Sequence, residues 1–390
     1  MMVNAHEPQP DQPFLQGHTA KAGQQMKISA IDTIVLRVPY DSGGPSDAQV
    51  WGGRAWETAD SLLVRVSTDA GLVGWGEAFG YNVIPATRAA IDQMLTPLFI
   101  GRNPLEAQSL MDEAQRKLHI FGRGGPVIYG LSGIDIALWD IAGKAAGKPL
   151  HRLLGGSGHT HLECYASLLR YGGDELVARN VTRALGEGFR SIKLHEVDPA
   201  AVKAARDAAG PSVDLMNDVN CPWSLDEALA MAEAFGPSEL RWLEEPIWPP
   251  EDYAALAELR TRIETPIAAG ENAATIAQFQ HLFQAGAVDI AQPSPAKMGG
   301  VTELRKVFEL AGRHGVTVVP HTFYDGPAFL AGLHVNAVCS GAPLVEWRFL
   351  DLHARLYGAA AVPVDGRIPL PEGPGLGFDP LPAVIERYRA

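Results

Sequence analysis

The feature that most constrains the fold is a regular rhythm in the second part of the chain. Short apolar runs alternate there with amphipathic helical stretches, and each run ends in a polar residue 23 to 27 residues after the previous one. One strand, one helix and two loops need about that many residues. Eight such units predict an α/β barrel of parallel strands. The polar residues at the run ends are Ser167, Lys193, Asp218, Glu244, Glu271, Ser294, His321 and Glu346.

The first part of the chain has a different pattern. Three runs between residues 26 and 80 are rich in β-branched and aromatic residues and predict a β meander. Residues 85–150 turn helical, with Leu131, Ile134 and Leu138 at helical spacing. We therefore expect a loose N-terminal tail over 1–25, an α+β domain over 26–155, the barrel over 156–350, and a C-terminal segment over 351–390 that returns to the first domain.

Composition narrows the range of partners. The net charge of −13, without a long charged run, argues against nucleic acid or an anionic membrane as the main partner. No apolar run approaches the ~18 residues of a membrane span. The three cysteines lie far apart, so we expect reduced thiols and a cytoplasmic protein. An anionic substrate would need a local cation, from a metal or a lysine.

The polar residues at the run ends predict where function lies. In parallel barrels of this kind the active site is formed at the C-terminal ends of the strands. Burying charged groups without partners is costly, so a purely structural barrel has no reason to carry so many on one rim. The sequence therefore predicts an enzyme with its site at this rim.

Three carboxylates on consecutive strands form a candidate metal site. Asp218, Glu244 and Glu271 should converge above the barrel, where they would repel each other without a cation. Oxygen ligands without His or Cys suit Mg²⁺, with Mn²⁺ as an alternative. Glu245 is a close competitor of Glu244 as a metal ligand. Strand alternation points the two side chains in opposite directions. The simpler interpretation, that each carboxylate caps a helix or pairs with a cation, suits one such residue better than three.

A long Gly-rich loop, YDSGGPSDAQVWGGRAWE, separates the first two strands of the first domain. Loops of this length are usually functional or disordered. Trp51, Arg54 and Trp56 within it favour a lid that contributes to substrate binding. The alternative is a surface loop whose aromatic residues pack on their own domain.

From about residue 27 onward the chain resembles the mandelate racemase-like subgroup of the enolase superfamily. The matching segments are LSGIDIALWDIAGKAAGKPLHRLLGG, SIKLH, LMNDVN, WLEEP, AAGEN, AQPSPAKMGGVTE, VVPHT and VEW. The resemblance implies an α+β capping domain over a modified (β/α)7β TIM barrel, and a homo-oligomer that acts on a small carboxylate. It implies Asp218, Glu244 and Glu271 as metal ligands and His321 as an acid/base. Glu346 is the implied hydrogen-bond partner of an enolate.

The chain departs from the subgroup at several positions. The common Lys-x-Lys after the second strand is replaced by Lys193-Leu194-His195. Ser294 stands where the subgroup carries the Asp that pairs with its seventh-strand His. We interpret Lys297, three residues further on, as structural or peripheral. Asn220 stands where some acid-sugar dehydratases carry a His, which disfavours those subtypes.

Together the residues predict abstraction of a proton next to a carboxylate. Lys193 and His195 lie two residues apart and so point to one side of the strand. In the subgroup the first lysine tends to contact the substrate carboxylate and the second removes the proton, so the resemblance implies Lys193 as the electrostatic partner of the substrate and His195 as the base, although the reverse is possible. With Ser294 as its only partner, His321 should be a poor base and serve as an acid. Glu346 would need a raised pKa to donate a proton to an enolate oxygen.

One base and one acid fit dehydration of a hydroxylated carboxylate such as an acid sugar, the commonest activity that the resemblance implies. The runner-up is a racemase, epimerase or cycloisomerase that uses the same enolate chemistry. A third hypothesis is a binding protein with a vestigial site, which the complete set of metal and acid/base candidates disfavours.

Overall fold

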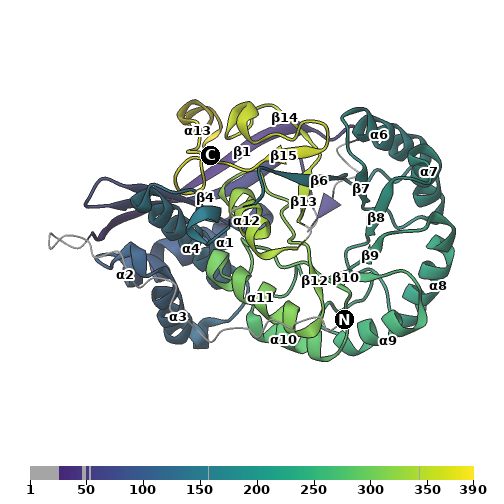
Figure 1. The fold of residues 1–390 in the computed structure, drawn as a ribbon, viewed down its shortest axis with the longest axis horizontal. Coiled ribbons are helices and arrows are strands. Elements are labelled where there is room, and N and C mark those ends of the chain that lie inside the picture. Colours follow the sequence, from purple (N-terminus) through teal and green to yellow (C-terminus); the bar gives the residue numbers. More distant parts are fainter. Residues whose placement is uncertain (1–25, 46–49, 52–53, 157, 342) are drawn as a thin grey trace, which may run out of the picture.

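The computed structural model describes residues 26–45, 50–51, 54–156, 158–341 and 343–390, and gives only the backbone of residues 50, 51, 54 and 55. The predicted tail over 1–25 lies outside the described residues. Figure 1 shows a sheet domain beside a barrel whose outer face is covered by helices.

The capping domain is built on an antiparallel sheet in the order β14-β1-β4-β5, in which β14 (Asp351–Leu352) comes from the end of the chain. Its long strands carry both buried and exposed side chains, as expected when one face packs on a core. The strands of this domain and its small hairpin are β1 (Ile28–Asp41), β2 (Val50–Trp51), β3 (Arg54–Ala55), β4 (Thr58–Thr68) and β5 (Val73–Ala78).

The helix α4 (Pro126–Ala146) packs against β5 and connects the capping domain with the barrel. A Cβ on Gly76 would lie 1.8 Å from the carbonyl oxygen of Gly133, so only glycine permits this approach. Elsewhere on the helix, Asp135 accepts hydrogen bonds from the backbone N–H and the hydroxyl of Thr302. These contacts fix the capping domain against the barrel helix that contains Thr302.

Eight parallel strands form the barrel, in the order β12-β11-β10-β9-β8-β7-β6-β13. These strands are β6 (His161–Ser167), β7 (Ser191–Leu194), β8 (Asp214–Asp218), β9 (Trp242–Glu244), β10 (Ile267–Ala269), β11 (Ile290–Ala291), β12 (Thr317–Val318) and β13 (Leu344–Arg348). The remaining helices are α1 (Ile84–Ala89), α2 (Thr96–Phe99), α3 (Ala107–Leu118), α5 (Leu150–Leu153), α6 (Asp174–Gly186), α7 (Pro199–Ala209), α8 (Leu225–Phe235), α9 (Tyr253–Arg262), α10 (Ile276–Gln284), α11 (Gly300–His314), α12 (Pro327–Cys339) and α13 (Pro382–Tyr388).

The barrel is joined by side-chain contacts where β12 and β13 meet. Among the described residues no backbone ladder connects these two strands. Thr322, just after β12, donates from its backbone N–H to the Glu346 carboxylate at 2.9 Å and from its hydroxyl to the Glu346 carbonyl at 3.0 Å. Glu346, a residue of the predicted site, therefore also helps to close the barrel.

The end of the chain contacts the capping sheet. After β13, strand β14 (Asp351–Leu352) pairs with β1, and the N–H of Ala390 donates to the Val35 carbonyl of β1. Strand β15 (Arg367–Pro369) pairs with β6 at the start of the barrel. The capping domain and barrel are as predicted, whereas the residue numbers at which we divide them stay a prediction.

Across the described part of the chain, no helix combines the length and apolar character needed to span a membrane.

Candidate active site

The barrel interior explains why the predicted residues face one another. A buried apolar layer inside the barrel includes Tyr165 of β6, Met216 of β8 and Trp242 of β9. Residues two positions apart in a strand point to the same side. Asp218 is two residues after Met216, and Glu244 is two residues after Trp242. Both acidic side chains therefore point into the barrel, next to this layer and nearer the C-terminal ends of the strands.

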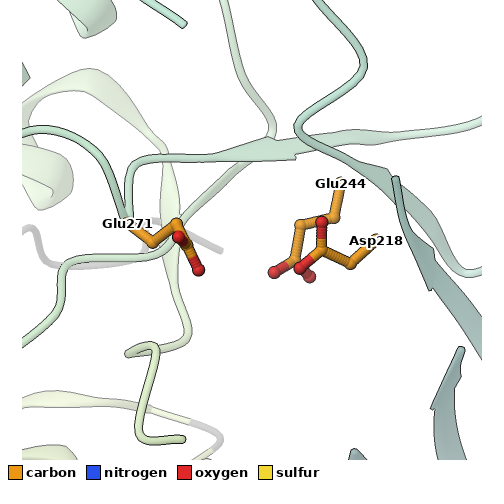
Figure 2. A group of neighbouring side chains, drawn as sticks. All are labelled: Asp218, Glu244 and Glu271. Atoms are coloured by element: carbon orange, nitrogen blue, oxygen red, sulfur yellow. The ribbon is translucent and has the colours of Figure 1, made fainter. Parts of the chain in front are cut away.

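The three predicted metal ligands come together at this end of the barrel. Oxygen atoms of Asp218, Glu244 and Glu271 lie within 4.8 Å of one another. Figure 2 shows the carboxylate of Glu271 turned toward the other two from the opposite side. The donor set is made of carboxylate oxygens alone, which are the ligands that Mg²⁺ prefers.

The electrostatics of this group fit a divalent cation. Burial, Asp218 and Glu346 raise the pKa of Glu244 well above its usual range, although Lys193 works in the other direction. Like charges held this close disfavour ionisation of all the groups at once. Burial also opposes ionisation of the other two carboxyl groups, but nearby cations lower their pKa values: Lys193 and His195 act on Asp218, and Lys297 and His321 act on Glu271. Two of the three groups are therefore held as carboxylates, and the oxygen donor set fits a metal of this kind.

Lys193 is buried in the middle of the charged cluster. Its ammonium lies 2.7 Å from Glu244, 2.9 Å from Glu346 and 3.5 Å from Asp218. Burial alone would lower the pKa of Lys193, but these carboxylates outweigh burial and raise it well above the ordinary value. The assignment of Lys193 as the electrostatic partner and of His195 as the base stays a prediction, with the reverse as the alternative.

Glu346 differs from the expectation. Burial works to raise its pKa, but Lys193 and His321 together with hydrogen bonds lower it below the ordinary value. The carboxylate accepts from the hydroxyl of Ser167 at 2.8 Å and from the backbone N–H of Thr322 at 2.9 Å. The neighbours of Glu346 are donors, so this arrangement does not give the raised pKa that we expected, and its role as the hydrogen-bond partner of an enolate stays a prediction.

His195 points into the site beside Asp218. Its Nδ1 bonds to the carbonyl of Leu168, and its Nε2 lies 3.4 Å from Asp218. A carbonyl oxygen can only accept, so Nδ1 carries the proton of this bond. In a neutral ring the lone pair is then on Nε2. His195 and Lys193 both contact Asp218, as expected for residues on one side of a strand.

His321 contacts a different member of the carboxylate group. Its Nε2 lies 3.0 Å from Glu271, and its Nδ1 lies 3.2 Å from the hydroxyl of Ser294. Ser294 therefore lies beside the histidine that the sequence paired it with. The Ser294 hydroxyl is in turn hydrogen-bonded to the hydroxyl of Tyr324.

Glu245 and Lys297 occupy different surroundings. Glu245 lies outside the three-carboxylate group and accepts from the amide of Asn272 at 2.8 Å, which favours Glu244 as the candidate ligand. Lys297, which we interpreted as structural or peripheral, instead places its ammonium 3.3 Å from Glu271. It is buried and lies 4.9 Å from the centre of the Phe79 ring of the capping domain. Lys297 therefore lies against a predicted ligand, and its structural role as the ion-pair partner of Glu271 stays a prediction.

Asn220 lies directly beside the predicted ligands. Its backbone is left-handed, with a φ of 56°, and its N–H donates to Asp218 at 2.9 Å. Within the described residues its side-chain oxygen is buried without a hydrogen-bond partner. Asn220 therefore helps to hold Asp218 in place.

Of the three predicted lid residues, only Trp56 has a described side chain. Trp51 and Arg54 pair with each other in the hairpin of β2 and β3, but their side chains lie outside the described part. The Trp56 ring stacks on the Tyr81 ring, with centroids 4.6 Å apart. The hydroxyl of Tyr81 donates at 3.0 Å to the carbonyl of Phe323, which lies two residues beyond the candidate histidine that follows strand β12. This contact connects the loop to one side of the candidate site.

Trp56→Ala should raise KM or change substrate preference by up to about 10-fold, because ring stacking of this kind contributes roughly 0.5–1.5 kcal/mol. We expect a smaller effect on thermal stability, since the ring is only half-buried. Steady-state kinetics with Trp56→Phe as the control, which keeps a ring against Tyr81, would check this. Unchanged kinetic constants in Trp56→Ala would rule out a lid.

Tyr324, Ser167 and Thr322 contact predicted site residues but were not assigned roles from the sequence. Ser167 had been noted only as a strand-end residue. Thr322 directly follows His321, and Tyr324 comes two residues later. That closeness to a strand-end histidine was the available signal.

Both parts of the chain match known families. Residues 31–155 match the mandelate racemase / muconate lactonizing enzyme N-terminal domain, and residues 176–384 match the enolase C-terminal domain-like family. The chain is 31% identical to an arabinonate dehydratase of Saccharolobus solfataricus, over 88% of this chain and 94% of that protein. It is 33% identical to a D-galactarolactone cycloisomerase of Agrobacterium fabrum, over 91% of this chain and 96% of that protein.

A crystal structure of a mandelate racemase/muconate lactonizing protein from Paracoccus denitrificans, complexed with magnesium, superimposes with a TM-score of 0.81. It is 27% identical and covers 94% of this chain and 98% of its own. The chain therefore belongs to the mandelate racemase/muconate lactonizing enzyme family of the enolase superfamily. The resemblance drawn from the sequence motifs is confirmed.

Proposed function

We propose that this protein is a Mg²⁺-dependent dehydratase of a hydroxylated carboxylate, such as an acid sugar. The observation that carries the proposal is the arrangement of Lys193, His195 and His321 around the three-carboxylate group at one end of the barrel. The arabinonate dehydratase among its relatives supports this substrate class.

Asp218, Glu244 and Glu271 would hold the metal, with Mn²⁺ as a possible substitute. When bound, Mg²⁺ supplies positive charge that stabilises the carboxylate of the substrate as an enolate forms. The magnesium-bound relative of similar fold supports the choice of metal. Lys193, held as an ammonium among carboxylates, adds a second positive charge beside the same region.

His195 is the proposed base. With its Nδ1 proton bound to the Leu168 carbonyl, a neutral His195 offers the Nε2 lone pair to the proton on the α-carbon of the substrate. The cation of His321, beside Glu271, is the proposed acid: it gives a proton to the leaving hydroxyl group and becomes neutral. Loss of the α-proton and of the β-hydroxyl, which leaves as water, gives an enol that becomes a 2-oxo acid.

Cycloisomerisation is the second candidate, favoured by the 33% identity to the D-galactarolactone cycloisomerase. The same residues would form the enolate, and no water would be lost. A racemase or epimerase needs a proton acceptor on both faces of the α-carbon. The serine beside His321 provides no carboxylate partner for a second base, which makes that activity the weakest of the three.

A panel of acid sugars and their lactones, incubated with the enzyme and Mg²⁺ in D₂O, tests the proposal. We expect at least one acid sugar to give a 2-oxo-3-deoxy acid, detected with a carbonyl reagent, in a reaction that stops on chelation. An isomeric product with the same elemental formula as its substrate would favour the cycloisomerase. The absence of both α-deuterium incorporation and turnover across the panel would contradict the proposal.

The cytoplasmic location, the homo-oligomeric assembly and the lid role of Trp51 and Arg54 remain predictions. Analytical ultracentrifugation of the purified protein would measure its assembly state.

A further inference from the structure

A line of three hydrogen-bonding side chains leads away from the carboxylate group. It begins at His321, whose Nδ1 lies 3.2 Å from the Ser294 hydroxyl, and continues from that hydroxyl to the hydroxyl of Tyr324. All three side chains are buried. In the described part of the chain, the Tyr324 hydroxyl has no hydrogen-bond partner other than Ser294.

Counting protons sets the direction of these two bonds. If Ser294 donated to Tyr324, the Tyr324 proton would be buried without an acceptor, which is costly. If Tyr324 and His321 both donated to Ser294, the Ser294 proton would be the one buried without an acceptor. Only one pattern satisfies every proton: Tyr324 donates to Ser294, and Ser294 donates to Nδ1 of His321. Burial raises the pKa of Tyr324 well above its ordinary value, which keeps this hydroxyl a donor.

The contacts of the other ring nitrogens do not set a direction. Nε2 of His321 lies 3.0 Å from a carboxylate oxygen of Glu271, and Nε2 of His195 lies 3.4 Å from one of Asp218. Both carboxylates are candidate metal ligands, so the position of the hydrogen on His321 follows from the hydroxyl groups of Ser294 and Tyr324 alone.

His195 has the opposite arrangement. Its Nδ1 bonds to the Leu168 carbonyl, so its neutral form carries the hydrogen on Nδ1 and the lone pair on Nε2. The two histidines near the carboxylate group would then present different atoms to a substrate. His195 would offer a proton acceptor and His321 an N–H donor.

We propose that Ser294 and Tyr324 are positioning residues that hold neutral His321 with its hydrogen on Nε2, so that this ring presents a donor in place of a base. The position of this hydrogen does not depend on the proposed function. Only its consequence, a reaction with a single base, rests on that function. A histidine paired with an aspartate has the reverse pattern, because the carboxylate accepts from Nδ1 and leaves the lone pair on Nε2.

The tautomer can be measured without any substrate. The metal-free enzyme, labelled with ¹⁵N-histidine, is observed by NMR at about pH 9, where an ordinary imidazole is neutral. His321→Asn identifies the signals of this ring by their loss. We expect a protonated Nε2 and an unprotonated Nδ1 for His321 in the wild type. A protonated Nδ1 would overturn the proposal, whatever the substrate of the enzyme proves to be.

Variants then test each positioning residue. Ser294→Asp offers only acceptors to His321 and Tyr324, so the hydrogen of His321 should move to Nδ1. Ser294→Ala removes the donor and should give a mixture of tautomers, which keeps the test available if the aspartate variant does not fold. Retention of the wild-type tautomer in either variant would show that Ser294 does not set it.

Tyr324→Phe removes the only other described partner of the Ser294 hydroxyl and should shift His321 part of the way toward the mixture seen with Ser294→Ala. The matched control is Tyr357→Phe, which removes a buried hydroxyl that has no hydrogen-bond partner among the described residues. It should leave the His321 signals unchanged. A spectrum of Tyr324→Phe identical to the wild type would remove Tyr324 from the proposal.

Discussion

Replacement of Glu271 by glutamine is expected to lower kcat/KM by more than about 100-fold, because even groups that only support metal ligands typically contribute 10- to 100-fold. The change removes one of three carboxylate charges that lie within 4.8 Å of one another. It also removes the negative charge that faces the ammonium of Lys297 at 3.3 Å. Mg²⁺ affinity, measured by calorimetric titration, should fall together with activity, while the circular dichroism spectrum stays that of a folded protein.

The neighbouring carboxyl group of Glu245 provides a matched control. Its oxygens accept from the amide of Asn272 at 3.0 and 2.8 Å and lie outside the three-carboxylate group. Glutamine keeps nearly the same shape there, so Glu245→Gln should change Mg²⁺ affinity and kcat/KM far less than Glu271→Gln. Equal losses in the two variants would argue against a specific ligand role for Glu271. Full activity of the wild type after exhaustive chelation would refute the metal requirement altogether.

The strand ends were predictable because a strand imposes a simple geometry. Glu244 is the last residue of β9, whereas Glu245 lies beyond the strand with a left-handed backbone (φ 47°), and Glu244 alone of the two joins Asp218 and Glu271 in the carboxylate group. Lys193 lies in β7 and His195 directly follows its last residue, Leu194, and both contact Asp218. Sequence spacing was therefore enough to place these side chains at one end of the barrel.

Further from the strand ends, sequence spacing no longer predicts where a side chain points. Strand β11 ends at Ala291, so Lys297 lies in the turn before α11, where its direction depends on packing against the capping domain. Tyr324 likewise lies in the segment after β12, and its hydroxyl is hydrogen-bonded to that of Ser294, which lies in the segment after β11. Neither contact follows from spacing, because each joins residues from two different loops.

The charge state of Glu346 was also beyond sequence reasoning. The expectation of a raised pKa treated the site as uniformly acidic. In the structure Lys193 lies 2.9 Å from Glu346, and hydrogen-bond donors from two other segments surround the same carboxylate. The direction of a pKa shift depends on such individual neighbours, which composition does not reveal.

His321→Asn should retain exchange of the substrate α-proton for deuterium while lowering product formation by about 10²- to 10⁴-fold, the usual contribution of a general acid. The reason is that His321 and His195 lie beside different carboxylates, at Glu271 and Asp218 respectively. If His195 removes the α-proton, the enolate still forms in the variant, and the deuterated base returns a deuteron to the α-carbon. The leaving hydroxyl group, however, has lost its proton donor.

The complementary variants should lose both activities. His195→Ala removes the proposed base, and Lys193→Ala removes the ammonium that lies 2.7 Å from Glu244 and 2.9 Å from Glu346. His161→Asn, at an exposed position at the start of β6, is the control for a histidine outside the site and should behave as the wild type. Both rates can be followed in one experiment, by mass spectrometry of substrate and product recovered from D₂O.

The pattern of exchange decides which histidine is the base. If exchange were lost in His321→Asn and kept in both His195→Ala and Lys193→Ala, the base would be His321, and the assignment of roles would be reversed. That outcome would require an Nε2 lone pair on His321, in conflict with the hydrogen bonds from Tyr324 through Ser294 to its Nδ1. Exchange and the ¹⁵N spectrum of His321 therefore test the same feature by independent measurements. Agreement between them would restrict this site to one proton acceptor, which a dehydratase or a cycloisomerase can use and a two-base racemase cannot.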